Sequence, residues 1–215
     1  MEKDIMANHV YYNIDIDSTE EGLKAFEDTL VTTTKTQLNW EQKEIKIEEL
    51  ADIHTLAFMP DAGELDEYEN QVDGYNWYCD NVGAKWCYIE EWSDTNISGY
   101  SAWSAPIFMA EHIARFIGKT DPAVSISMTY EDEYRNFIGV ARITLDEDME
   151  TDVDLEETDG DEITEKMRKH FNLSEEDIED EDFDLWEELE TSDGNKYVPG
   201  EYMDDLVCEF FNNNR

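Results

Sequence analysis

Carboxylates are the most abundant groups in this chain that could take part in chemistry. Residues 146–162 read DEDMETDVDLEETDGDE, and 11 of these 17 residues are acidic while none is basic. Paired carboxylates can act as general acid and base, but only where burial or a specific neighbour moves a pKa. Because every acid in this run has acidic neighbours, the sequence singles out no catalytic pair.

A run rich in aspartate can also bind Ca²⁺. A calcium loop of the helix–loop–helix type has acids at positions 1, 3 and 5, glycine at position 6 and glutamate at position 12. With Asp152 as position 1, position 6 is Glu157, position 12 is Ile163, and Gly160 falls at position 9. The pattern therefore fails, and we expect only loose, non-stoichiometric binding of cations.

The other reactive residue types are scattered. The histidines have no HxH, HxxxH or HExxH spacing, and the sequence has no CxxC pair and no glycine-rich phosphate loop. Cys79 and Cys87 flank an expected turn and are better interpreted as ordinary buried thiols than as a site. We predict no catalytic residues, no metal site and no cofactor, and expect a protein that is not an enzyme, with an enzyme of hidden site as the minor alternative.

The elements that must position the acidic run follow from hydrophobic periodicity. Alternating apolar residues predict strands, and apolar residues three and four apart predict helices. The expected strands cover residues 10–16, 86–92, 97–103, 123–130 and 136–145, with 44–50 as either a strand or a short helix. The expected helices begin at Ser18, run from Pro106 to Gly118, and recur at 163–171, 174–189 and 203–211.

Local signals place the ends of two of these helices. Ser18 reads as an N-cap with Glu21 in the capping-box position, and Gly118 reads as a C-cap. Trp103 and Ser104 read as a core aromatic followed by the N-cap of the helix that Pro106 opens. The polar stretch 61–74 is expected to be a loop.

The order of these elements predicts an α+β, ferredoxin-like fold, an antiparallel sheet with helices on one face. We expect this domain to cover residues 1–145, followed by an acidic linker or loop over 146–162. An acidic helical extension then covers 163–215, and its docking on the first domain is left open. The last 70 residues carry 28 acids against 5 bases, so the charge is concentrated there.

The net charge of −41 limits the partners. Anionic lipid headgroups and nucleic-acid phosphates repel such a surface, so we expect no membrane binding and no direct nucleic-acid binding. Three widely spaced cysteines and no long apolar run favour a reducing cytoplasm. The oligomeric state cannot be predicted, and the natural partners are basic proteins.

One specific hypothesis is mimicry of DNA, with carboxylates in place of phosphates on a basic nucleic-acid-binding host protein. Spread over on the order of 10,000 Å², the net charge gives about one charge per 250 Å², under half the density of duplex DNA. An acidic face could equal that density. The candidate partner-binding residues are Asp152, Asp154, Glu156, Glu157, Asp159, Asp161, Glu162, Glu175, Glu176, Asp177, Glu179, Asp180, Glu181, Asp184, Glu187 and Glu188. The alternative is a structural or interaction module whose acidic surface serves solubility.

Four short stretches, in order, resemble a known family. MANHVYYNIDI (6–16), WYCDNVGAKW (77–86), SAWSAP (101–106) and YEDEYRNFIG (130–139) are similar to motifs of the YubB ferredoxin-like (Api92-like) domain of phages and plasmids. The resemblance covers residues 6 to about 145. The sequence departs from the family pattern at Val82, Ala84, Cys87 and Ala105.

This resemblance implies a ferredoxin-like fold and an origin in a mobile element, and it implies no reaction. Together with the charge, it leads us to expect a phage-type accessory protein that acts by protein–protein binding in the host bacterial cytoplasm.

Overall fold

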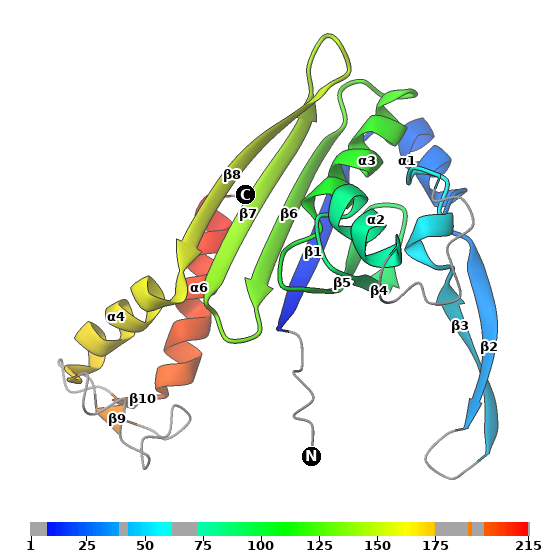
Figure 1. Ribbon diagram of the computed structural model, residues 1–215. Coiled ribbons are helices and arrows are strands. Elements are labelled where there is room, and N and C mark those ends of the chain that lie inside the picture. The colour runs from blue at the N-terminus through cyan, green and yellow to red at the C-terminus, as the bar shows by residue number, and fades with distance from the viewer. Residues whose placement is uncertain (1–7, 39–42, 62–72, 175–188, 191–195, 215) are drawn as a thin grey trace.

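The computed structural model describes residues 8–38, 43–61, 73–174, 189–190 and 196–214, and shows an α+β protein built on one antiparallel sheet (Figure 1). The sheet has six strands in the order β4-β5-β1-β6-β7-β8. Their bounds are β1 His9–Asp17, β4 Cys87–Trp92, β5 Asn96–Ala102, β6 Ser125–Asp132, β7 Phe137–Leu145 and β8 Thr151–Asp159. The alternating patterns therefore predicted the first five of these strands correctly.

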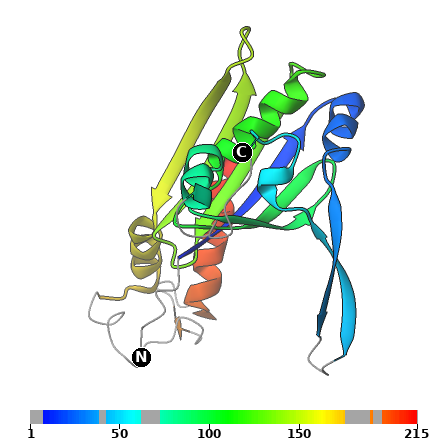
Figure 2. The ribbon, with the colours of Figure 1, turned by 45° about the vertical axis from the view of Figure 1, so that its right-hand side comes forward.

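The larger core lies between one face of the sheet and the helices α1 (Glu20–Glu27) and α3 (Ile107–Gly118), with α2 (Asp73–Asn81) beside α3 (Figures 1 and 2). In β1, every second side chain points into this core, so that Val10, Tyr12 and Ile14 are buried. Ile113 and Ile117, one helical turn apart on α3, are fully buried against them. The intervening polar residues of β1 consequently lie on the opposite face.

A second, smaller core lies at the other end of the sheet. Helix α4 (Gly160–Phe171) follows β8 directly, and α6 (Pro199–Asn214) runs behind β7 on the face away from α3 (Figures 1 and 2). Ile138 of β7 is fully buried among apolar side chains of both helices. Within residues 1–145 the helices of the larger core lie on one face, whereas α6, part of the expected extension whose docking was left open, packs on the other face against β7.

Two strands outside the main sheet form a separate hairpin. β2 (Thr32–Leu38) and β3 (Glu44–Leu50) pair with each other along their whole length. The hairpin projects from the body beside β4 (Figure 1), and the short 3-10 helix η1 (Ile53–Thr55) follows it and contacts β4. Residues 44–50, for which sequence left two alternatives, are thus a strand. A further pair, β9 (Leu189–Glu190) and β10 (Lys196–Tyr197), is two residues long on each side.

The acidic segment is the main correction. Residues 151–159, expected to belong to a linker or loop over 146–162, form β8 and pair with β7 residue by residue from Leu145–Thr151 to Phe137–Asp159. Like charge disfavours a compact hairpin, but β7 is a well-formed strand whose backbone groups need partners. Only 146–150 form the turn, and the sheet continues past residue 145 into β8.

Several local signals were displaced by one or two residues. Thr19, not Ser18, caps α1, because its side chain accepts a hydrogen bond from Gly22 N. Gly118 is the last residue of α3 rather than its cap, and residues 73 and 74 of the expected loop belong to α2. Leu189, expected at the end of a helix, lies in β9.

Trp103 is not a core residue. Its side chain is 54% exposed and its φ of 74° lies in the left-handed region, where non-glycine residues are uncommon. Ser104 does not cap α3, because its Oγ donates to Gly83 O at 2.6 Å instead. The turn expected between Cys79 and Cys87 begins at Val82, directly after α2, and Gly83 within it has a positive φ of 88°.

Candidate functional site

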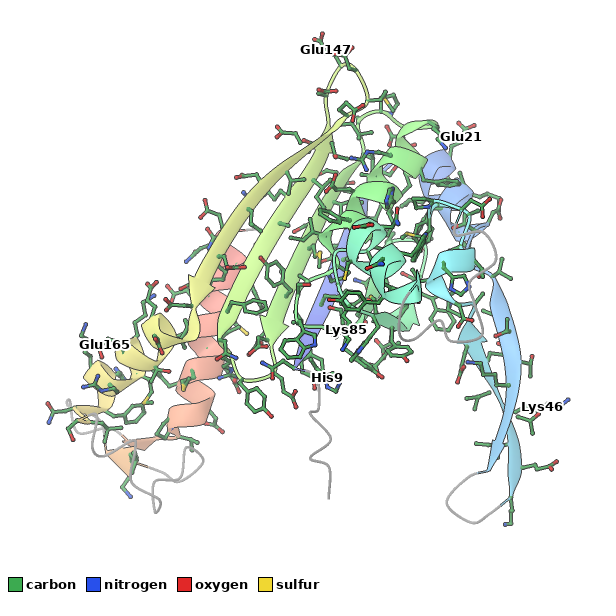
Figure 3. The ribbon with its side chains drawn as sticks, viewed as in Figure 1. His9, Glu21, Lys46, Lys85, Glu147 and Glu165 are labelled. Carbon is green, nitrogen blue, oxygen red and sulfur yellow. The ribbon has the colours of Figure 1, made fainter. Side chains whose placement is uncertain are left out.

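Strand β8 is an edge strand. It pairs with β7, and no strand among the described residues pairs with its other side. All its residues between Asp152 and Glu157 are exposed. Acidic residues continue at both ends, with Glu147 at the tip of the β7–β8 turn and Glu165 on α4 (Figure 3). The acidic run of the sequence is thus laid out along one border of the molecule.

The pleat divides the carboxylates of β8 between two faces. Asp152, Asp154 and Glu156 stand opposite Thr144, Arg142 and Val140 of β7 and share the face on which α6 lies. We call these three carboxylates the β8 row. Within the row, Asp154 accepts a hydrogen bond from Arg142 at 3.4 Å, an exposed contact of little energetic weight.

Glu157, on the helix-covered face, has a structural contact. The Tyr130 hydroxyl donates to Glu157 Oε2 at 2.8 Å. Burial, followed by this hydrogen bond, raises the pKa of Tyr130 well above its ordinary value. Tyr130 therefore stays protonated as the donor, and Glu157 joins β8 to the sheet rather than facing solvent alone.

Asp159 and Glu162 stabilise the start of α4. Asp159 accepts from Glu162 N at 2.8 Å, the N-cap hydrogen bond of the helix. Glu162 accepts from Thr158 Oγ1 at 2.9 Å and lies 3.0 Å from Lys166 Nζ. Glu162 accepts a hydrogen bond from Lys166 and another from Thr158, and these bonds, that of Lys166 first, lower the pKa of Glu162. These hydrogen bonds and this ion pair are sufficient to explain why positions 159 and 162 are acidic.

A cavity of about 510 Å³ lies at the end of β8, where the strand meets α4, α6 and the β6–β7 turn. Asp159 and Asp161 are among its lining residues, with Arg135 opposite. Arg135 is bonded to Glu131 at 2.6 Å and to Asp204, and these carboxylates occupy its guanidinium. We therefore interpret this cavity as a gap at the junction of β8, α4, α6 and the β6–β7 turn, where the ion pairs of Arg135 hold the elements together.

Gly160 makes this junction possible. A Cβ at this position would lie 1.7 Å from the carbonyl oxygen of Arg135, which is backbone and cannot turn aside. The β6–β7 turn and the first turn of α4 can approach only because this side chain is absent.

The β8 row can act as a line of negative charge. At about 3.4 Å per residue, the three carboxylates of the row lie about 6.8 Å apart and span roughly 14 Å. One strand of DNA carries a charge per about 3.4 Å of axis, and the duplex one per about 1.7 Å. The row thus has about half the linear charge density of one strand of DNA and about a quarter of that of the duplex.

The remaining candidates lie outside the described residues. These are Glu175, Glu176, Asp177, Glu179, Asp180, Glu181, Asp184, Glu187 and Glu188. Of the seven described candidates, the structure brings Asp152, Asp154 and Glu156 together on one face, while Glu157, Asp159 and Glu162 have local structural contacts.

Over the described ranges, no group of three or more His, Cys, Asp or Glu side chains is arranged to hold a metal ion. The helices of the same ranges include none that is long and apolar enough to cross a bilayer.

Sequence reasoning missed a cluster of aromatic rings on the face of the sheet opposite α3. His9, Trp86 and Tyr100 are neighbours, with ring centroids 5.1 Å to 6.0 Å apart, and Tyr88 lies 5.4 Å from Tyr100. Tyr11 and Tyr88 are 49% and 57% exposed. The signal was available in HVYYNID, because the period of two that buries Val10 and Tyr12 turns Tyr11 to the other face.

No protein-family model matches this chain, and comparison with curated proteins and with solved structures likewise gives no match. The candidate site therefore has to be interpreted from its own geometry.

Proposed function

We propose that this chain is a binding protein that presents the β8 row to a basic partner protein. One observation supports the proposal most: three carboxylates on one face of an edge strand, beside a line of backbone donors and acceptors that no described strand pairs. An edge of this kind can accept an added strand, whose main chain gives affinity and whose side chains give selectivity.

A basic strand is the partner that fits this edge. Cross-strand pairs of opposite charge contribute roughly 0.2–1 kcal/mol each, whereas an acidic or apolar strand would gain no such pairs. Binding would displace counterions from both partners, so we expect it to weaken as salt rises.

DNA mimicry is the most specific form of this proposal. The regular spacing of carboxylates along β8 supports it for a protein that contacts one strand of nucleic acid at a time. The partner would then be a basic, nucleic-acid-binding host protein, met in the bacterial cytoplasm by a phage-type accessory protein. We propose no catalytic activity.

We also propose that the body of the chain is ferredoxin-like and related to the YubB domain. The segments β1-α1-β4-β5-α3-β6 follow a βαββαβ order, and their strands lie as β4-β5-β1-β6. This is the arrangement in which two interleaved βαβ units form one antiparallel sheet. The β2–β3 hairpin and α2 are then an insertion, and β7, β8, α4 and α6 are an extension.

The alternative function is a structural or interaction module that does not bind through its acids. A specific observation favours it: charged side chains on an edge strand prevent pairing with other edges, and β8 bears them where two copies of the chain would otherwise meet. In that case the β8 row maintains solubility and has no partner.

The test is a pull-down from bacterial lysate with the tagged full chain, followed by measurement of Kd for the protein recovered. The variant carries Asp152→Asn, Asp154→Asn and Glu156→Gln, and its matched control carries Glu20→Gln, Glu21→Gln and Glu27→Gln on exposed positions of α1. We expect a roughly 3- to 100-fold loss of affinity for the β8 variant alone.

Competition with duplex and with single-stranded DNA separates the forms of the proposal. Loss of the partner on addition of DNA would support mimicry, and a partner indifferent to DNA would support strand addition without mimicry. Equal binding by the β8 variant and its control would overturn the proposal in favour of the solubility role.

A further inference from the structure

A second cavity of about 510 Å³ lies at the opposite border of the sheet, between β4 and the end of the β2–β3 hairpin. Tyr88, Tyr100 and Trp92 contribute rings to its wall, and Cys87 and Ile89 contribute the strand beneath. η1 contributes Ile53. The cavity thus lies between the hairpin with η1 on one side and β4 with Tyr100 of β5 on the other, and Tyr78 of α2 completes its lining.

The rings on this wall are available to a ligand. Tyr88 and Tyr100 lie with centroids 5.4 Å apart at an interplanar angle of 40°. Tyr88 is 57% exposed, so its ring can be reached from solvent. The faces of such rings are negative and attract a cation placed within about 6 Å of the centroid.

The charged residues of the lining point to the same ligand. Glu48, Glu49, Asp52 and Glu90 contribute four carboxylates against the single cation Lys35. Only Glu49 is paired with that cation, at 2.5 Å, and the other three form no ion pair within the described part of the chain. The lining therefore carries a net charge of −3, which would be balanced by added positive charge.

Two pKa shifts are consistent with a cavity that favours positive charge. The carboxylate of Glu49, through a hydrogen bond and then its charge, raises the pKa of Lys35, so the cavity already holds one alkyl ammonium group. Burial, followed by the charge of Glu90, raises the pKa of Tyr100, which keeps the ring neutral and its hydroxyl a donor.

We propose that this cavity binds the guanidinium or primary ammonium group of an organic cation between the tyrosine rings and the carboxylates Glu48 and Glu90. Rings and carboxylates together select an organic cation, because a hard metal ion needs a shell of oxygen ligands and gains little from a ring. The site is independent of the β8 row, which lies on the other border of the sheet.

The same group can be supplied by a free amine or by an arginine or lysine side chain of a polypeptide. Calorimetry with the full chain distinguishes the two sources. The probes are agmatine and spermidine as free cations, N-acetyl-arginine amide as a side-chain cation, and N-acetyl-citrulline amide as its neutral counterpart. We expect the arginine derivative to bind at least tenfold more tightly than the citrulline derivative.

Two matched pairs of variants locate the binding. Glu90→Gln changes a lining carboxylate, and Glu91→Gln changes its exposed neighbour, which does not line the cavity. Tyr88→Leu removes a ring of the wall, and Tyr134→Leu removes an exposed ring of the β6–β7 turn, outside the cavity. We expect Tyr88→Leu and Glu90→Gln to weaken binding roughly 5- to 30-fold and the two controls to leave it within twofold.

Equal weakening by each variant and its control would mean that cations condense on the acidic surface without a site, and would overturn the proposal. So would measurable binding of both the arginine and the citrulline derivative with equal affinity. Binding of the free amines but not of N-acetyl-arginine amide would support the site and assign it to a small molecule. Binding of all the cations would support a site open to side chains as well.

Discussion

The two borders of the sheet are protected in different ways. The β4 border is flanked by the β2–β3 hairpin and η1, which leave a cavity walled with rings. The β8 border has no such cover among the described residues and bears carboxylates instead. Exposed strand edges invite pairing with other chains, and both cover and charge prevent it. The acids of β8 therefore have a structural use, the protection of an exposed edge, that requires no partner.

The sheet is also supported by two cores of different size. The larger core, with Ile113 and Ile117 of α3 fully buried, reaches from β4 to β7, and α3 contacts β6, β7 and β8. The smaller cluster lies on the other face of β7, where Ile163, Met167 and Phe171 of α4 face Met203 and Val207 of α6. We expect α4 and α6 to unfold first, since local stability follows buried apolar contact.

Truncation within each core gives the largest expected effects. Ile163→Ala and Ile113→Ala should each lower the free energy of unfolding by about 2–5 kcal/mol, measured by denaturant titration. Hydrogen exchange separates them: Ile163→Ala should release amides of α4 and α6 while β1 stays protected, and Ile113→Ala should release both. Equal loss of protection in β1 for the two variants would show that the cores unfold as one unit.

Replacing either of two glycines by alanine gives the next largest expected change in the free energy of unfolding. Gly160→Ala places Cβ against the backbone oxygen of Arg135, whereas Gly118→Ala places it 2.1 Å from Leu145 Cδ1, the end of a side chain that can turn. We expect Gly160→Ala to cost about 1–3 kcal/mol and Gly118→Ala less than about 1 kcal/mol. Thermal unfolding of the two variants measures the difference, and a reversed order would contradict the close approach at the β8–α4 junction.

The pH dependence of stability distinguishes Asp121, a structural carboxylate, from the carboxylates of the β8 row. Asp121 accepts hydrogen bonds from Thr19 N and Ser18 Oγ, both at 2.7 Å, and these bonds, that of Thr19 first, lower the pKa of Asp121. The stabilisation is present above its unfolded pKa, about 3.9, and is lost as pH falls through the lower folded value.

Asp121→Asn should therefore destabilise the protein at pH 7, with a difference from the unmodified chain that shrinks as pH falls below about 4. Asp152→Asn in the β8 row is the control, and should change stability by no more than about 0.5 kcal/mol at pH 7. Urea titrations at several pH values measure both. A difference for Asp121→Asn that is constant down to pH 2 would refute the assigned bonds.

The smallest expected effect is a difference in thiol reactivity without any change in stability. Cys87 of β4 is buried, and burial raises its pKa to about 12 despite the hydrogen bond to Tyr12. At pH 8, on the order of one thiol in 10,000 would then be ionised. Cys208 of α6 is exposed, so a thiol reagent should label it first, and mass spectrometry of the modified peptides identifies the order.

The fold was predictable from sequence wherever one face of an element is buried and the other is not. β1 and α3 have this contrast, and their spans were predicted almost to the residue. β8 lacks it, because most of its residues are exposed on both faces, so periodicity gives no signal. Its strand conformation depends on β7, a partner that no local pattern of residues 151–159 reveals.

For the candidate site, the sequence predicted the acidic composition but not the arrangement of the carboxylates. That residues 152–162 are acidic is plain from the sequence, but which acids share a face follows from the register with β7. The caps and hydrogen bonds that occupy Glu157, Asp159 and Glu162 depend on the β8–α4 junction, which the expected linker did not contain. The ring-walled cavity needed a contact between the β2–β3 hairpin and β4, elements about 40 residues apart.

The central place of β1 also bears on how the chain is made. β1 pairs with β5 and with β6, so its second neighbour is complete only when Asp132 has been added, 115 residues after Asp17. At about 5–20 residues per second, translation leaves an apolar strand without its partners for roughly 6–23 s. Strands β7 and β8 then join by short hairpins, each within seconds of the strand before it. Of the strands of this sheet, β1 thus waits longest for its neighbours, and the rate of elongation sets how long the nascent chain depends on its own charge, or on a chaperone, to stay soluble.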